Sequence, residues 1–166
     1  LRKNTAILGK GNVGTAYGEC LEPFHMNVMY FTRGDYLAEC VRDADFVFNA
    51  ISSLPENNGF LGREFYFDMM KTGARFLSVT SPKIYTVPAL IEALGESKIR
   101  QAALDIGGGT VGDVNFITYK EVLGHPKIIA TPQVAHYSDH TAKIGYDMMI
   151  DNIEARIKGE ALHILV

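Results

Sequence analysis

Three glycines near the start of the chain, Gly9, Gly11 and Gly14, form the pattern G-x-G-x-x-G. The pattern follows a short apolar run at residues 5–8 and precedes a segment of helical character at residues 15–23. In such a place the first glycine permits a tight turn, the second lets the backbone approach a pyrophosphate, and the third lets helix and strand pack closely. A helix N-terminus also favours an anion. We therefore predict a dinucleotide site rather than a purely structural turn. Its expected members are Gly9, Gly11, Asn12, Val13 and Gly14.

A second group of polar residues follows the next apolar run and reads Thr32-Arg33-Gly34-Asp35. A carboxylate about 20 residues beyond the glycine loop commonly binds the adenosine ribose 2′-hydroxyl. A hydroxyl beside a guanidinium suits a 2′-phosphate better, because Arg donates charged, bidentate hydrogen bonds to phosphate oxygens. We therefore predict binding of NADP or NAD, with NADP preferred through Thr32 and Arg33. Alternatively, Arg33 is a solvated loop charge and Asp35 either caps the next helix or reaches the ribose.

The elements that must position these residues alternate along the chain. Strand-sized apolar runs occur at residues 5–8, 28–31, 46–51, 75–79, 102–105 and 128–130. Helical segments lie between them, one with Pro88 in its first turn and Gly95 at its end. A long last helix is expected from Ser138 to Gly159. This alternation predicts an α/β fold with a doubly wound, mostly parallel sheet of the Rossmann type.

The size and charge of the chain restrict its class. It has 166 residues, 16 basic and 19 acidic side chains and a net charge of −3, so we expect one dinucleotide-binding domain over residues 1–166. The missing basic surplus argues against nucleic acid and anionic membranes as partners. No apolar stretch approaches the ~20 residues that cross a bilayer. With only Cys20 and Cys40, neither a disulfide framework nor a zinc site is expected, which fits a cytoplasmic protein.

Several short strings carry a resemblance to a known family. They are LPENNG at 54–59, MKTGA at 70–74, ALIEAL at 89–94, AALD at 102–105 and TP at 131–132. With the glycine loop, they make the chain resemble the nucleotide-binding domain of the D-isomer-specific 2-hydroxyacid dehydrogenases from the loop to the C-terminus. The resemblance implies an oxidoreductase domain that holds NAD(P)H for hydride transfer with a 2-oxo or 2-hydroxy acid. It also implies a homodimer and a separate substrate domain, and we expect this chain to lack that domain.

Further cofactor contacts are expected at the carboxyl ends of the later strands. They are Ile51, Ser52, Thr80, Ser81 and Asp105. The resemblance aligns Asp105 with the family's contact to the nicotinamide carboxamide, and a plain helix or loop cap is the alternative role.

The resemblance also implies a catalytic set of Arg, Glu and His, and this chain has Ser81, Thr110 and Gln133 at those positions. Gln exchanges no proton near neutral pH, and Ser cannot clamp a carboxylate as Arg does. We therefore expect the usual reaction to be absent and the isolated chain to be inactive. The alternative function is a non-catalytic module that binds or senses NAD(P)H after losing the catalytic residues.

Substitute groups are weakly indicated. His136 and Lys83 lie close to the substituted positions, although His136 is also explained as a residue that packs locally. His136, Asp139 and His140 lack a further spaced ligand, so no metal site is predicted. The glycine run at 107–112 is either a backbone approach to a ligand or simply a flexible stretch.

Overall fold

The computed structural model describes residues 2–106, 120–160 and 162. The chain divides into two compact units, Leu1–Gln133 and Val134–Val166. The first unit holds the sheet, and the second holds the helix α5 (Asp139–Ile157). Thr110 and the glycine run at 107–112 lie outside the described residues.

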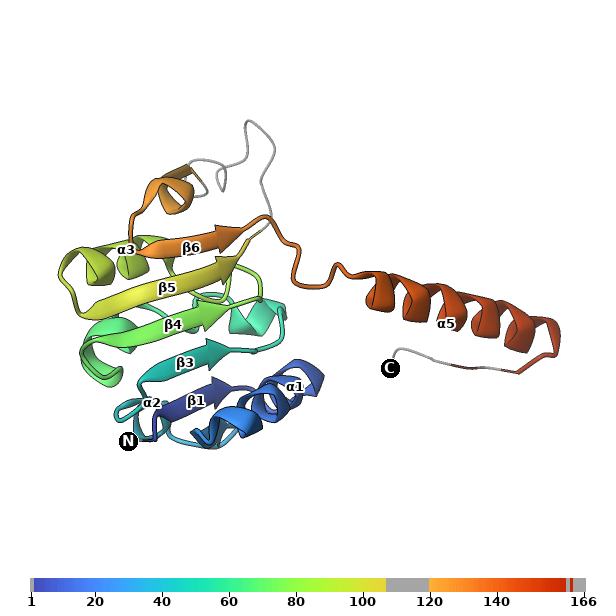
Figure 1. Ribbon diagram of the computed structural model, residues 1–166, viewed down its shortest axis with the longest axis horizontal. Helices are drawn as coiled ribbons and strands as arrows, with labels where there is room; N and C mark the ends of the chain where they lie inside the picture. Colours follow the sequence, from blue (N-terminus) through green and yellow to red (C-terminus); the bar gives the residue numbers. More distant parts are fainter. Residues whose placement is uncertain (1, 107–119, 161, 163–166) are drawn as a thin grey trace. The chain divides into compact units, whose positions relative to one another are not determined.

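The first unit is built on a parallel sheet of six strands in the order β2-β1-β3-β4-β5-β6 (Figure 1). The strands are β1 (Asn4–Leu8), β2 (Asn27–Phe31), β3 (Phe46–Asn49), β4 (Ala74–Ser78), β5 (Ile99–Asp105) and β6 (Ile128–Thr131). This arrangement confirms the predicted α/β fold and each predicted strand. β3 ends two residues earlier than expected, because the Asn49 side chain accepts a hydrogen bond from the Ile51 N–H and turns the chain out of the ladder.

The strand order reverses at β1, which pairs with β2 on one side and with β3 on the other. The chain therefore winds outward in both directions from the middle of the sheet. In open α/β sheets, ligands bind outside the carboxyl ends of the strands at such a reversal. The topology directs attention to the loops that follow β1, β2 and β3.

Helices cover both faces of the sheet. They include α1 (Asn12–Leu21), α2 (Leu37–Val41), η3 (Phe65–Met69) and α3 (Val87–Gly95), with short turns η1 (Glu22–Phe24) and η2 (Pro55–Asn57). Successive residues of a strand point to opposite faces. In β3, Val47 is fully buried, whereas its half-buried neighbour Phe48 contacts the Tyr17 ring of α1 at 5.0 Å between centroids. α1 therefore lies on the face opposite the main core.

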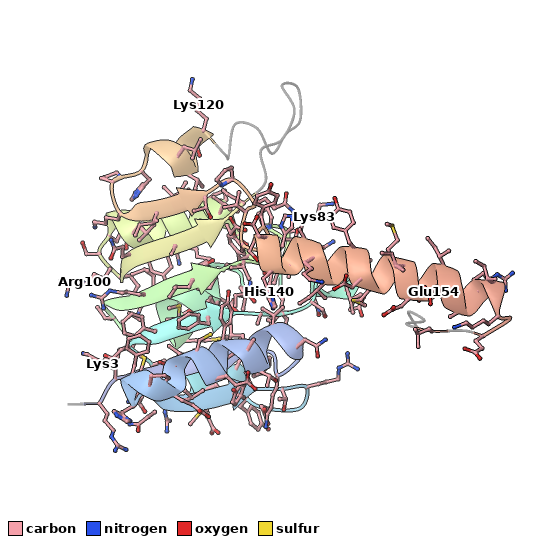
Figure 2. The ribbon with its side chains drawn as sticks, turned by 45° about the vertical axis from the view of Figure 1, so that its right-hand side comes forward. Lys3, Lys83, Arg100, Lys120, His140 and Glu154 are labelled. Carbon is pink, nitrogen blue, oxygen red and sulfur yellow. The ribbon has the colours of Figure 1, made fainter. Side chains whose placement is uncertain are left out.

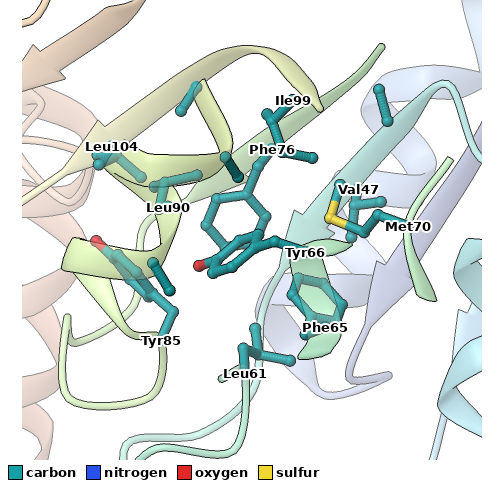
Figure 3. Close-up of a cluster of buried hydrophobic side chains, with 14 of the residues drawn as sticks. Val47, Leu61, Phe65, Tyr66, Met70, Phe76, Tyr85, Leu90, Ile99 and Leu104 are labelled. Atoms are coloured by element: carbon teal, nitrogen blue, oxygen red, sulfur yellow. The ribbon is translucent and has the colours of Figure 1, made fainter. Parts of the chain in front are cut away.

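The main core contains a group of aromatic rings (Figure 3). Phe76 of β4 makes edge-on contacts with Tyr66 at 5.6 Å and with Tyr85 at 5.5 Å between ring centroids, and Phe65 lies beside Tyr66 at 5.1 Å. Edge-to-face pairs are the favoured arrangement of aromatic rings, and each adds about 1 kcal/mol beyond burial of area. Burial raises the pKa of the Tyr66 hydroxyl, which stays protonated.

The second unit contains the long helix expected at the end of the chain. Ser138 caps its N-terminus, because its Oγ accepts a hydrogen bond from the Thr141 N–H at 3.1 Å. Gly159 follows the helix with a φ of +79°. Both predicted ends are confirmed. No helix in the described part of the chain combines the length and apolar character needed to cross a membrane.

A charged cluster fastens the edge of the sheet where the strands begin. The Asp45 carboxylate, 17% exposed, accepts hydrogen bonds from Lys71 Nζ at 2.9 Å and from the Asn4 N–H at 3.1 Å. Lys3, labelled at this edge in Figure 2, adds an ion pair at 3.6 Å. The Lys71 hydrogen bond, followed by that of Asn4, holds the pKa of Asp45 below its ordinary value.

Replacing Asp45 by Asn should lower the free energy of unfolding by about 1 kcal/mol at pH 7. Because the folded pKa of Asp45 lies below the unfolded one, this stabilisation is present above the unfolded pKa and is lost as the pH falls through the folded pKa. The difference between wild type and Asp45→Asn should therefore narrow below about pH 4 in urea unfolding. Asp43→Asn is the control, since that exposed carboxylate pairs with the adjacent Arg42. An equal loss in both variants would contradict the prediction.

Candidate functional site

A cleft of about 730 Å³ opens at the carboxyl ends of β1, β2 and β3. Six residues predicted from the sequence line it, namely Gly9, Gly11, Thr32, Arg33, Ile51 and Ser52. Sequence reasoning missed other lining residues, among them Lys10, Phe31, Leu37, Asn57 and Phe60. The cleft therefore lies where the strand order reverses.

The glycine loop is shaped by close backbone contacts. Gly9 has a φ of +104°, and a Cβ there would come within 2.8 Å of the Ala50 carbonyl oxygen. A Cβ on Gly14 would overlap the carbonyl oxygen of Gly9. Gly11 differs, because a Cβ there would meet no atom within 4 Å. Two of the glycines are thus required by the fold, and Gly11 leaves open space beside the backbone.

The N-terminus of α1 begins in this open space. Gly11 is its N-cap residue, no side chain caps the helix, and its first turn contains no acidic residue. Asn12, Val13 and Gly14 form that turn, and the first N–H groups of an α-helix have no partner within the helix. These N–H groups and the helix dipole suit a phosphate group. The glycines have the geometry of a pyrophosphate cradle.

The turn after β2 is closed by its own acidic residue. Asp35 Oδ2 accepts hydrogen bonds from the Thr32 N–H at 2.6 Å and from Thr32 Oγ1 at 2.8 Å. These two bonds, the side-chain one first, lower the pKa of Asp35. The residue before α2, Tyr36, caps that helix without a side-chain bond. Asp35 therefore does not cap α2. Its Oδ2 is bonded to Thr32, and the residue lines the cleft.

Arg33 lies in the same turn and is exposed. Within the described residues, no carboxylate forms an ion pair with its guanidinium. The turn thus presents a positive side chain to the cleft, while its negative one is engaged by Thr32.

Apolar side chains form another wall of the cleft. The rings of Phe31 and Phe60 lie 6.0 Å apart between centroids, and Leu37 and Ile51 also line the cavity. A flat aromatic group can stack against such a wall. Phe60 is far from Phe31 in the sequence, so its place in the cleft had no sequence signal.

A buried polar bridge joins the ends of β3 and β4. Asn49, fully buried, donates from Nδ2 to Ser78 Oγ at 3.2 Å and to Thr80 Oγ1 at 2.8 Å. Its Oδ1 accepts from the Ile51 N–H at 3.2 Å. Asn49 thereby sets the course of both loops that leave these strands. Its one sequence signal is a polar residue at the end of an apolar run.

The predicted residues after β4 lie outside the lining of this cleft. Thr80 is tied to Asn49, and the Ser81 N–H donates to Ser53 Oγ at 3.3 Å. Ser81 Oγ accepts from the Lys83 N–H at 3.3 Å. The Ser81 hydroxyl is therefore held in a local turn.

Asp105 ends β5 and accepts a hydrogen bond from Thr131 Oγ1 of the neighbouring β6. Burial, together with the negative charge of Asp105, raises the pKa of Tyr17 to about 12. The Tyr17 hydroxyl is therefore protonated at neutral pH. The Asp105 carboxylate therefore lies at the carboxyl end of β5, close enough to the neutral Tyr17 phenol to affect its pKa.

The remaining candidates occupy different units. Gln133 ends the first unit with a φ of +55°, and its N–H donates to the Thr131 carbonyl at 3.0 Å. His136 is exposed and belongs to the second unit. Within the described ranges, no three His, Cys, Asp or Glu side chains gather as a metal site.

Replacing Gly14 by Ala should lower the free energy of unfolding by about 2 kcal/mol or more, because the new Cβ forces the loop away from Gly9. Gly11→Ala should change it by less than about 0.5 kcal/mol, since the added carbon meets open space. Thermal unfolding of the two variants measures the contrast. Equal stabilities would contradict a requirement for glycine at position 14.

The comparisons with known proteins agree with this geometry. Residues 2–135 match the family described as "D-isomer specific 2-hydroxyacid dehydrogenase, NAD binding domain". D-3-phosphoglycerate dehydrogenase 1 of Saccharomyces cerevisiae is 26% identical over 151 residues, which cover 80% of this chain and 32% of the relative. D-lactate dehydrogenase of Staphylococcus aureus is 23% identical over 158 residues, covering 83% and 48%. The chain spans from a third to about half of these curated relatives.

Solved structures show the same fold. The NAD-complexed D-isomer specific 2-hydroxyacid dehydrogenase of Lactobacillus delbrueckii ssp. bulgaricus superposes with a TM-score of 0.88 at 20% identity, covering 99% of this chain and 56% of that one. An acyclic imino acid reductase in complex with NADPH and D-Arg gives 0.82 at 21%, covering 99% and 54%. None of these comparisons supports the non-catalytic alternative. The chain belongs to the D-isomer specific 2-hydroxyacid dehydrogenase family, of which it is an NAD-binding domain.

Proposed function

We propose that this chain is the cofactor half of an oxidoreductase that prefers NADPH and reduces or oxidises a 2-oxo or 2-hydroxy acid. One observation carries the preference. In the turn after β2, Thr32 engages the Asp35 carboxylate, whereas Arg33 is left without an ion pair among the described residues. A 2′-phosphate needs a cation at this position, and the guanidinium of Arg33 provides one.

The described residues fit each part of such a cofactor. The open backbone at Gly11 and the α1 N-terminus would hold the pyrophosphate, and the wall that contains Phe60 would take the adenine ring. Arg33 would hold the 2′-phosphate, because the N–H and the hydroxyl of Thr32 both donate to Asp35. When bound, the nicotinamide supplies hydride exchange. Asp105 would hold the carboxamide, and Ile51, Ser52, Thr80 and Ser81 would line the path towards it.

Both cofactors occur on this fold. The Lactobacillus structure contains NAD, and the acyclic imino acid reductase contains NADPH. The choice in this chain therefore depends on its own residues in the turn after β2. The exposed guanidinium of Arg33 favours the phosphorylated cofactor, because charge-assisted bonds to phosphate are about twice as strong as neutral ones.

At the substituted positions, this chain lacks the residues that would transfer a proton and bind the substrate carboxylate, so other groups would have to do both. Ser81 and Gln133 stand where the resemblance expects Arg and His, and neither carries a charge or exchanges a proton near neutral pH. We therefore infer a reaction that draws its acid–base group from outside these positions. His136 is the candidate on this chain, and a substrate domain would supply the others. The chain by itself is proposed to be inactive.

We also propose a separate substrate domain and a cytoplasmic location for the protein. A separate domain would form the substrate pocket, since the chain spans about half or less of these curated relatives. We place the protein in the cytoplasm, where the free thiols of Cys20 and Cys40 persist.

Association into a homodimer is also proposed. α5 presents large exposed apolar side chains along one stripe, including Tyr146, Met149 and Ile153. A helix that leaves such a stripe in water gains free energy by covering it. Sedimentation of the chain should give twice the monomer mass of 18.3 kDa. A monomer at every accessible concentration would contradict this.

The cofactor proposal is tested by titrating the chain with NADPH and with NADH. NADPH should bind at least about tenfold more tightly, which corresponds to ~1.4 kcal/mol, and should raise the melting temperature. Arg33→Met should weaken NADPH binding and leave NADH binding nearly unchanged.

Two further variants complete this design. Gly11→Ala should weaken both cofactors, because its methyl group fills the space next to the pyrophosphate. Arg42→Met is the control, since Arg42 pairs with Asp43 and does not line the cleft. NADH binding at least about tenfold more tightly than NADPH would overturn the preference. No binding of either cofactor would overturn the proposed function.

A further inference from the structure

We propose that Lys10 is the second cation of a two-cation clamp for the cofactor's 2′-phosphate and so helps to determine cofactor specificity. This inference rests on the proposed function. It adds a residue from a different loop, because Lys10 lies between the first two glycines whereas Arg33 follows β2.

The backbone brings these two loops together. The Gly9 N–H donates to the Phe31 carbonyl at 2.9 Å, which fastens the start of the glycine loop to the last residue of β2. Lys10 follows Gly9, and Thr32 follows Phe31. Lys10 and Thr32 each follow a residue of this hydrogen bond in the chain, so the two loops begin side by side.

The Lys10 side chain extends towards β2. Its Nζ lies 5.1 Å from the centroid of the Tyr30 ring. Tyr30 lies in β2, two residues before Thr32, where the turn begins. A cation over an aromatic ring is attracted by the ring face, which donates nothing and accepts no conventional hydrogen bond. The Tyr30 ring thus holds the Lys10 ammonium near the turn that begins at Thr32. The N–H groups of the ammonium remain available to a ligand.

Two positive and two negative side chains line the cleft. Lys10 and Arg33 both line the cavity, together with the carboxylates of Asp35 and Glu56. Asp35 is hydrogen-bonded to Thr32, and neither cation forms an ion pair among the residues that the structure describes. A phosphate monoester carries about −1.5 to −2 charges at pH 7. The Arg33 guanidinium neutralises one of these negative charges, and the Lys10 ammonium neutralises the rest.

The alternative is that Lys10 only packs on Tyr30, or contacts the pyrophosphate that both cofactors share. The three roles predict different results. A packing role affects stability without a cofactor, a pyrophosphate role weakens NADPH and NADH equally, and the clamp weakens NADPH alone.

The experiment measures the dissociation constants of NADPH and NADH for wild type, Lys10→Met, Lys10→Arg, Arg33→Met and the double Met variant. Lys10→Met should weaken NADPH about tenfold, as expected for loss of a charge-assisted bond, and change NADH by less than about twofold. Lys10→Arg should retain most of the preference. The double variant should bind both cofactors about equally. The melting temperature without cofactor should stay within about 3 °C of wild type.

The matched control is Lys98→Met. It removes one positive charge at the opposite edge of the sheet, where Lys98 Nζ donates to Thr72 Oγ1 at 3.1 Å. If Lys98→Met weakens NADPH binding as much as Lys10→Met does, the effect of Lys10 comes from the net charge of the chain. That result would overturn the clamp.

Other outcomes separate the clamp from the proposed function. Equal weakening of both cofactors by Lys10→Met, or no weakening of either, overturns the role of Lys10 while Arg33→Met still tests the cofactor preference. If wild type does not prefer NADPH and Arg33→Met changes nothing, the proposed preference itself fails.

Discussion

The close backbone contact between the glycine loop and the end of β3 is the constraint on which the cleft depends. Gly9 lies against the Ala50 carbonyl and Gly14 against the Gly9 carbonyl, with no side chain between them. The Gly9 N–H donates to the Phe31 carbonyl and the Ala50 N–H donates to the Leu8 carbonyl. These two hydrogen bonds join the carboxyl ends of β1, β2 and β3. The position of the α1 N-terminus therefore follows from backbone geometry. The side chains around the cleft are placed relative to that fixed point.

Much of this arrangement could be predicted from the sequence, because it is encoded locally. Each strand contains a short apolar run, as expected for a sheet covered on both faces, and the glycine spacing reports the loop conformation directly. The cap at Ser138 and the glycine after α5 are also local signals. Such features depend on residues a few positions apart, so the order of residue types is enough to find them.

The rest depends on contacts across the fold that no local pattern reports. Phe60 joins Phe31 only because the loop after β3 returns over the cleft, and Lys10 gains its place from a hydrogen bond to another strand. Asn49 reads as the end of an apolar run, yet its side chain stops β3 and ties it to β4. The sequence is compatible with Asp35 either as a helix cap or as a ribose contact. Its bonds to Thr32 become evident once the turn is closed.

The bridge at Asn49 has a consequence for the thermodynamics of ligand binding. Its amide is buried and uses both its donor and its acceptor side, so separating the ends of β3 and β4 would leave several polar groups without partners in an apolar environment. The adjoining rim is thus ordered before any ligand arrives. A rim that is already ordered loses little conformational entropy on binding. Association at this edge of the cleft should resemble insertion into a preorganised slot, and any closing movement should come from another part of the protein.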